Sequence, residues 1–267
     1  MVDGEVVRRQ RDGMPFNSPI APPDRWLLWL EGRVLFELAA VLPALPVLRR
    51  APRGDGHPVL VLPGLGASDF STRTLRAFLR ERGYHVHGWK LGRNLGPSPE
   101  RAVAMAERLE SLHRKHGRRL SLVGWSLGGI YARELARRFP TMVRQVITLA
   151  SPFRDVDAVN VPQFLRRRAE SRPLRDQAAL RAQLAAPLPV PSTAIYSRTD
   201  GIVAWRSCRE EPGPERENIE VVSSHLGIGH HPVAMLTIAD RLAQPEGAWR
   251  PFQIPAGWRW PLVPQVE

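Results

Sequence analysis

The segment at residues 120–129 constrains the fold of this 267-residue chain more than any other. It opens with an apolar run typical of a buried strand, reads G-x-S-x-G at residues 124–128, and continues with a helical pattern. A serine in this motif lies on a tight, strained turn, and the two glycines let the strand and the helix approach each other. The pattern predicts a nucleophile elbow that lifts the Ser126 hydroxyl above the edge of a sheet.

Strand and helix patterns alternate about six times along the chain, which predicts one α/β domain with a doubly wound, mainly parallel sheet of about six strands. Chains of this length commonly bury one large core. The predicted strands are 58–62, 84–89, 120–123, 143–149, 193–197 and 219–222, and the predicted helices of the domain are 72–82, 99–116, 127–139 and one that begins near Pro232. Functional loops in such a sheet follow the carboxyl ends of the strands.

We expect residues 51–245 to form this domain, with an N-terminal arm and amphipathic helix at 1–50 and an extended tail at 246–267. Apolar residues recur at near-helical spacing from Trp26 to Val41. We expect this helix to pack on the domain or beside the substrate mouth, with a position at a membrane interface as the alternative. Residues 153–189 carry four prolines and two short helical patterns, 162–170 and 174–184. This insertion forms either a lid over the site or an ordinary crossover between strands.

The formal net charge of +12 comes almost wholly from scattered arginines, without the basic tract or motif of a nucleic-acid-binding protein. Peripheral contact with an anionic membrane surface stays open as an alternative. The single cysteine, Cys208, excludes an internal disulfide. Neither a signal peptide nor an uninterrupted apolar stretch of membrane-spanning length is evident, so we expect a cytoplasmic protein, with membrane association as the alternative.

A serine nucleophile needs a base, here a histidine on a loop at the same edge of the sheet. Five of the eight histidines lie before a strand, within a strand or at a helix end, and we expect structural or solvated roles for them: His57, His85, His87, His113 and His116. Three histidines, His225, His230 and His231, lie in the loop after the last predicted strand. His225 is favoured because it follows that strand most closely. These three lack the cysteine or acidic partners of a metal site, so no metal is expected.

The base needs an acid that fixes its tautomer and balances its charge. Asp200 lies three residues beyond Ser197, at the end of the preceding predicted strand. It is either this acid or a turn residue before Gly201, and the position after the right strand favours the acid. Asp155 and Asp157, one strand earlier, are the alternatives.

An oxyanion that forms at the substrate needs two hydrogen-bond donors. The amide of Leu127 directly follows Ser126, and the glycine-rich loop after the first predicted strand offers the amide of Leu65. The same loop lacks the glycine spacing and the lysine of a phosphate-binding loop, so no nucleotide cofactor is expected.

Four segments of the chain resemble the α/β-hydrolase superfamily, and within it bacterial esterases and lipases of the triacylglycerol-lipase-like type. They are 59–66, 123–129, 199–203 and 224–228, and the resemblance extends over about residues 58–243. Relatives of this type carry the catalytic histidine in a His-x-Gly segment, which Ser224-His-Leu-Gly-Ile228 matches. Residues 26–48 stand where the fuller fold has antiparallel strands.

The resemblance implies a serine hydrolase for small-molecule or lipid esters, with the triad Ser126, Asp200 and His225 and no cofactor. Two alternatives stay open. In the first, the same triad transfers the acyl group to an alcohol or thiol, as in an acyltransferase. In the second, the chain is a non-catalytic scaffold that binds membranes or partners through its tryptophan-rich ends. The sequence carries no signal for acyl chain length or oligomeric state.

Overall fold

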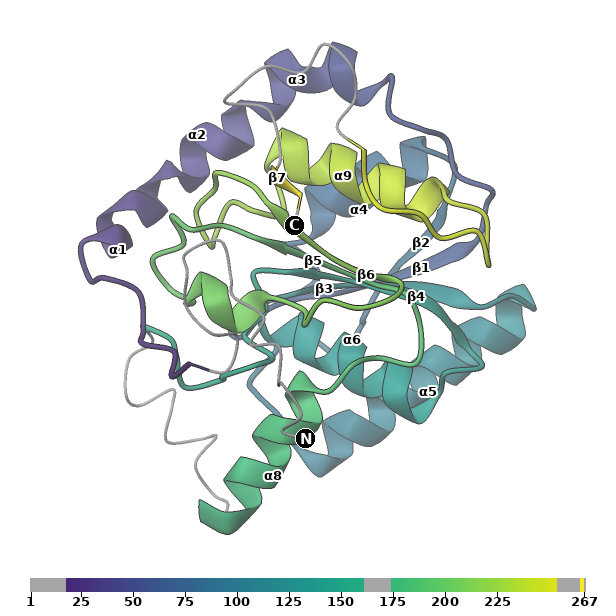
Figure 1. Cartoon of the computed structure of the whole chain (residues 1–267). Helices are drawn as coiled ribbons and strands as arrows, with labels where there is room; N and C mark the ends of the chain where they lie inside the picture. Colours follow the sequence, from purple (N-terminus) through teal and green to yellow (C-terminus); the bar gives the residue numbers. More distant parts are fainter. Residues whose placement is uncertain (1–17, 161–173, 254–264, 267) are drawn as a thin grey trace, which may run out of the picture.

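The computed structural model describes residues 18–160, 174–253 and 265–266 (Figure 1). Its sheet has the order β2-β1-β3-β4-β5-β6-β7. The strands are β1 (Pro58–Leu62), β2 (His85–Gly88), β3 (Leu120–Trp125), β4 (Val143–Leu149), β5 (Ser192–Tyr196), β6 (Arg216–Glu220) and β7 (Gln265–Val266). All neighbouring pairs from β2 to β6 are parallel, and only the short β7 is antiparallel to its neighbour. The prediction of a mainly parallel α/β sheet is confirmed.

Helices cover both faces of the sheet (Figure 1). Those of the domain are α4 (Arg73–Glu81), α5 (Pro99–His116), α6 (Leu127–Arg138), α8 (Leu174–Ala185), the short η2 (Trp205–Cys208) and α9 (Pro232–Ala243). Alternate residues of β1 face opposite ways: Val59 and Val61 join the core beneath α4 and α9, whereas Leu60 and Leu62 join the core beneath α5 and α6. Burial on both faces explains why the strands read as continuous apolar runs.

The N-terminal segment forms several short helices rather than one, namely α1 (Leu27–Leu30), η1 (Glu31–Arg33), α2 (Val34–Ala39) and α3 (Val41–Leu48). They run along one side of the molecule, and α3 packs against α9 (Figure 1). The backbone of Leu27 lies directly against Gly201, because a Cβ built at Gly201 would be 2.4 Å from the Leu27 carbonyl oxygen. The segment therefore reaches the loops at the carboxyl ends of β5 and β6.

Of the two helices predicted within 153–189, the second is present as α8, and the first lies outside the described residues. Arg137 of α6 donates to the Leu184 carbonyl oxygen at 2.9 Å and fixes the end of α8. The predicted tail contributes β7, a strand that the sequence pattern did not reveal. In the described parts of the chain, no helix is both long and apolar enough to cross a membrane.

Candidate active site

Ser126 lies at the turn between β3 and α6 with φ 53° and ψ −122°, a backbone conformation that is strained for any residue with a side chain. The close approach of strand and helix requires the flanking glycines. A Cβ at Gly124 would be 2.4 Å from the Gly128 carbonyl oxygen, and a Cβ at Gly128 would be 2.3 Å from that of Leu62. Steric crowding thus explains why the G-x-S-x-G motif has glycine at both positions.

The two amides predicted to bind an oxyanion lie around Ser126. Leu127 is the first residue of α6, so its N–H has no partner within the helix. Gly64, which precedes Leu65, packs on the serine: a Cβ built there would be 3.2 Å from Ser126 Cβ. Within the described residues, neither the Leu65 nor the Leu127 amide has a hydrogen-bond acceptor in the protein. Both are free to bind a ligand.

Asn94 holds the loop that carries Leu65, and sequence reasoning missed it. It is fully buried, and its side-chain amide donates to the Pro63 carbonyl oxygen at 2.9 Å. Its backbone accepts from Gly66 and donates to Ala67, each at 2.7 Å. Asparagine in a loop of this composition carries no sequence signal that separates it from a turn residue.

His225 and Asp200, which follow β6 and β5, are in direct contact. His225 Nδ1 and Asp200 Oδ2 are 2.7 Å apart, and both side chains are buried. The other oxygen, Asp200 Oδ1, accepts from the amides of Ile202 at 2.8 Å and Val203 at 2.7 Å. These two amides fix the carboxylate, which in turn fixes the imidazole with Nε2 available for a second partner.

The electrostatic surroundings of His225 favour its protonated form. Burial lowers the pKa of the imidazole, but the charge of Asp200, its hydrogen bond and the charge of Glu31 together raise it above 6.5. A base with a raised pKa accepts a proton more readily once it is neutral.

Trp125 connects the end of β3 to the histidine loop. Its indole Nε1 donates to the His225 carbonyl oxygen at 3.1 Å, which places this loop beside the turn that carries Ser126. Among the described residues, Ser126 Oγ makes no hydrogen bond to His225. The structure therefore brings the histidine and the acid together and holds the serine on the adjoining loop, and such contacts often tighten only when substrate binds.

Glu31 of η1 supports both loops of the site. Its carboxylate is buried and accepts three backbone amides: Gly201 at 2.9 Å, His225 at 3.0 Å and Leu226 at 3.0 Å. One side chain of the N-terminal helices thus joins the loop of Asp200 to the loop of His225.

Glu37 supports the histidine loop in a similar way, through the residue that precedes His225. It is buried and accepts the Ser224 amide at 2.8 Å, and it also accepts the Ser224 hydroxyl. The sequence analysis assigned no role to Glu31 or Glu37. The sequence signal that could have revealed their role is the presence of two acids in an otherwise apolar segment. If such a segment is buried, its carboxylates need hydrogen-bond donors from elsewhere in the protein.

The alternative site residues lie elsewhere. Asp155 and Asp157 both approach Arg181 of α8. The ring of His230 meets the edge of Trp125 at 5.5 Å, and burial lowers the pKa of both His230 and His231. Asp155 and Asp157 pair with Arg181 whereas Asp200 contacts His225 directly, so Asp200 is the acid that the geometry favours.

A hydrogen-bonded Ser-His-Asp chain that does not include Ser126 lies at the opposite end of the sheet. His57 Nδ1 is 2.5 Å from Asp55 Oδ1, and His57 Nε2 is 2.8 Å from Ser121 Oγ. Ser121 is fully buried within β3, so no substrate reaches its hydroxyl. Burial and the neighbouring Arg144 lower the pKa of His57 to about 4. His57 and Ser121 are therefore buried parts of a hydrogen-bond network inside the domain.

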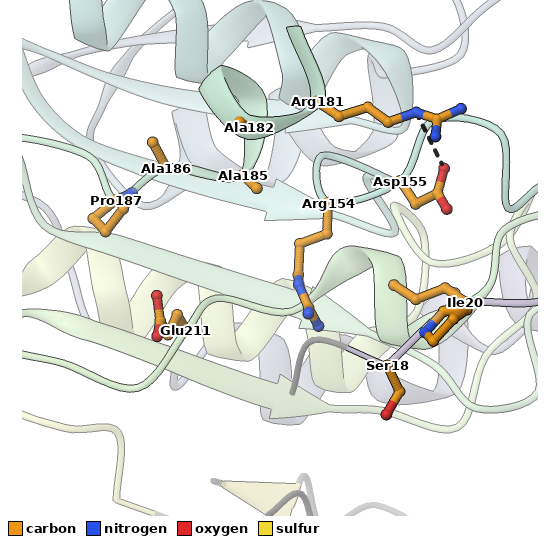
Figure 2. A pocket seen from close by; sticks show the side chains of 11 residues that line it. Ser18, Ile20, Arg154, Asp155, Arg181, Ala182, Ala185, Ala186, Pro187 and Glu211 are labelled. Carbon is orange, nitrogen blue, oxygen red and sulfur yellow. Dashed lines mark ion pairs between the residues drawn. The ribbon is translucent and has the colours of Figure 1, made fainter. Parts of the chain in front are cut away.

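A cavity of about 440 Å³ lies between α8 and the loop that follows β4. Figure 2 shows the side chains that line it. It is lined by residues of the segments 18–20, 154–155 and 181–187 and by Glu211. Ser126, Asp200 and His225 do not line it, so it lies outside the constellation described above. No group of side chains suited to hold a metal ion occurs in the described part of the chain.

Comparisons with known proteins agree with this architecture. The model of the alpha/beta hydrolase family matches residues 59–264. Lipase B of Aspergillus fumigatus superposes with a TM-score of 0.53 at 15% identity, over 72% of this chain but only 53% of its own. Mature lipase BlEst2 of Bacillus licheniformis gives 0.51 at 17% identity over 73% of this chain and 95% of its own.

Mouse alpha/beta hydrolase domain-containing protein 10 gives a TM-score of 0.50 at 16% identity, over 72% of this chain and 91% of its own. A comparison with curated proteins gave no match. At such identities the structural likeness shows the fold alone, whereas the family model covers most of the sequence. The chain belongs to the alpha/beta hydrolase family.

Proposed function

We propose that this protein is a serine hydrolase that cleaves carboxylic esters. The observation that carries the proposal is the 2.7 Å contact between His225 and Asp200, on loops at the sheet edge where Ser126 occupies its strained turn. Two structural neighbours are lipases, which supports ester substrates.

In the first half of the reaction, Ser126 Oγ attacks the acyl carbon of the ester, and His225 Nε2 accepts the hydroxyl proton. The resulting oxyanion receives hydrogen bonds from the Leu65 and Leu127 amides. His225 then donates its proton to the alkoxide as the C–O bond breaks. An alcohol leaves, and the acyl group stays on Ser126.

In the second half, His225 takes a proton from a water molecule, which attacks the acyl carbon. The tetrahedral intermediate collapses, the proton returns to Ser126 Oγ, and the carboxylic acid leaves. Asp200 keeps Nδ1–H in place and stabilises the imidazolium in both halves. No step requires a metal or an organic cofactor.

Apolar side chains at the same edge favour an apolar acyl group. Leu65 is 37% exposed and Leu226 is 46% exposed, each on a loop that carries part of the proposed machinery. Burying such side chains against a substrate is favourable in proportion to the apolar area covered. Small-molecule and lipid esters both fit this chemistry.

Hydrolysis of p-nitrophenyl esters with acyl chains of two to sixteen carbons tests the proposal. We expect the wild type to release p-nitrophenol and Ser126→Ala to show only the background rate. Equal rates for the two proteins would refute the assignment of Ser126. Transfer of the acyl group to added alcohol without release of free acid would refute hydrolysis as the reaction.

A further inference from the structure

The outer face of α1–α3 is an apolar surface that nothing in the described structure covers. Trp29 is 88% exposed, Phe36 79% and Leu42 71%. Further exposed apolar side chains of the same helices are Trp26, Leu28, Leu35, Leu38 and Val47. Apolar groups gathered this densely on an exposed face mark an interaction site rather than ordinary surface.

The acidic and the basic side chains of this segment lie on different sides of it. Between residues 25 and 53 the only acids are Glu31 and Glu37, and both are buried against the catalytic loops. The arginines at the ends of the segment, Arg25, Arg49, Arg50 and Arg53, are exposed. The outward face of α1–α3 therefore combines apolar residues with flanking positive charge, and the exposed Asp24 lies just before it, beside Arg25.

We propose that α1–α3 dock on the surface of a bilayer that contains anionic lipid. Tryptophan side chains prefer the headgroup region, and helices with an apolar face and flanking basic residues lie in the plane of the interface. The net charge of +12 adds attraction to anionic headgroups. This combination fits a lipid surface better than a second copy of an equally basic chain.

Docking on this face brings the catalytic edge to the lipid. The outer face belongs to the same short helices whose Glu31 and Glu37 hold the loops of Asp200 and His225. A bilayer that orders these helices also steadies both loops and presents the site to membrane-borne esters. Only this supply of substrate rests on the proposed function; the docking itself does not.

Co-sedimentation of the full chain with vesicles tests the docking. We expect the protein to sediment with vesicles of equal parts phosphatidylcholine and phosphatidylglycerol, and less with phosphatidylcholine alone. The double variant Trp29→Ser/Phe36→Ser should lower the partition coefficient at least about tenfold. Arg49→Glu/Arg50→Glu should lower it about fivefold or more for each arginine.

Matched controls lie on α5, on the opposite side of the sheet from α9 and α3 (Figure 1). Val103→Ser removes an exposed apolar side chain and Arg114→Glu reverses an exposed charge, and both should sediment as the wild type does. Variants are compared once their melting temperatures match the wild type. Absence of vesicle binding, equal binding by Trp29→Ser/Phe36→Ser, or a dimer that this variant dissolves would overturn the docking proposal. Hydrolysis of a water-soluble ester, measured without vesicles, reports separately on the proposed function.

Discussion

Replacement of Glu31 by glutamine should damage the site although residue 31 contacts neither the substrate nor the reacting atoms. Oε1 of Glu31 accepts the amides of Gly201 and His225, and Oε2 accepts that of Leu226. A glutamine offers one oxygen and one NH₂ group. In either orientation of the side chain, at least one buried N–H therefore faces another donor.

The size of the effect follows from these three bonds. One unsatisfied buried amide costs about 1–3 kcal/mol, and the loss of charge weakens each remaining bond by up to about 1 kcal/mol. A drop of about 2–4 kcal/mol in the free energy of unfolding leaves a domain of this kind folded, since typical stabilities are about 5–15 kcal/mol. The displaced histidine loop should lower kcat/KM about 10- to 100-fold.

The assay combines urea denaturation with kcat/KM for a p-nitrophenyl ester as a function of pH. Because the charge of Glu31 raises the pKa of His225, Glu31→Gln should also move the acidic limb of the profile to lower pH. A merely structural residue would lower the amount of active protein without moving this limb.

Glu107→Gln is the matched control, because Glu107 is an exposed carboxylate on α5. It should leave stability, kcat/KM and the pH profile unchanged. An unchanged kcat/KM and pH profile in Glu31→Gln would refute the conclusion that the N-terminal helices position the catalytic loops.

Three further predictions concern the site itself. His225 accepts the serine proton only when neutral, so kcat/KM should rise with pH through a pKa above the ordinary value for histidine, and a transition at or below that ordinary value would contradict the raised pKa of His225. Asp200→Asn should lower kcat by about four orders of magnitude, because the imidazole loses its fixed tautomer; a near-wild-type kcat would place the acid elsewhere. Gly124→Ala puts a Cβ 2.4 Å from the Gly128 carbonyl oxygen, so urea denaturation should show a loss of at least about 1–3 kcal/mol; unchanged stability would mean that the turn tolerates side chains.

The parts of the fold that could be predicted are those with a local signal. Strand β1 is an apolar run, and α5 begins at Pro99 and ends before Gly117, which adopts a left-handed conformation with φ 60°. The positions of Ser126, Asp200 and His225 followed from parallel topology, because loops at the carboxyl ends of neighbouring strands converge.

The parts that could not be predicted depend on contacts between distant segments. Glu31 meets His225 across 194 positions of the sequence, and no local pattern indicates which way a carboxylate on a short helix points. Strand β7 has two residues and exists only through its pairing with β6. The hydrogen bond from His57 to Ser121 likewise depends on how β1 pairs with β3.

Ser121 is hydrogen-bonded to one His-Asp pair and Ser126 lies on the loop beside another, so the identity of the nucleophile is the central question. A fluorophosphonate probe, followed by mass spectrometry of the labelled peptide, answers it directly with wild type, Ser126→Ala and Ser121→Ala. We predict covalent label on Ser126 in the wild type and in Ser121→Ala, and none in Ser126→Ala. Label retained by Ser126→Ala, or found on Ser121, would contradict the assignment of Ser126 as the catalytic serine.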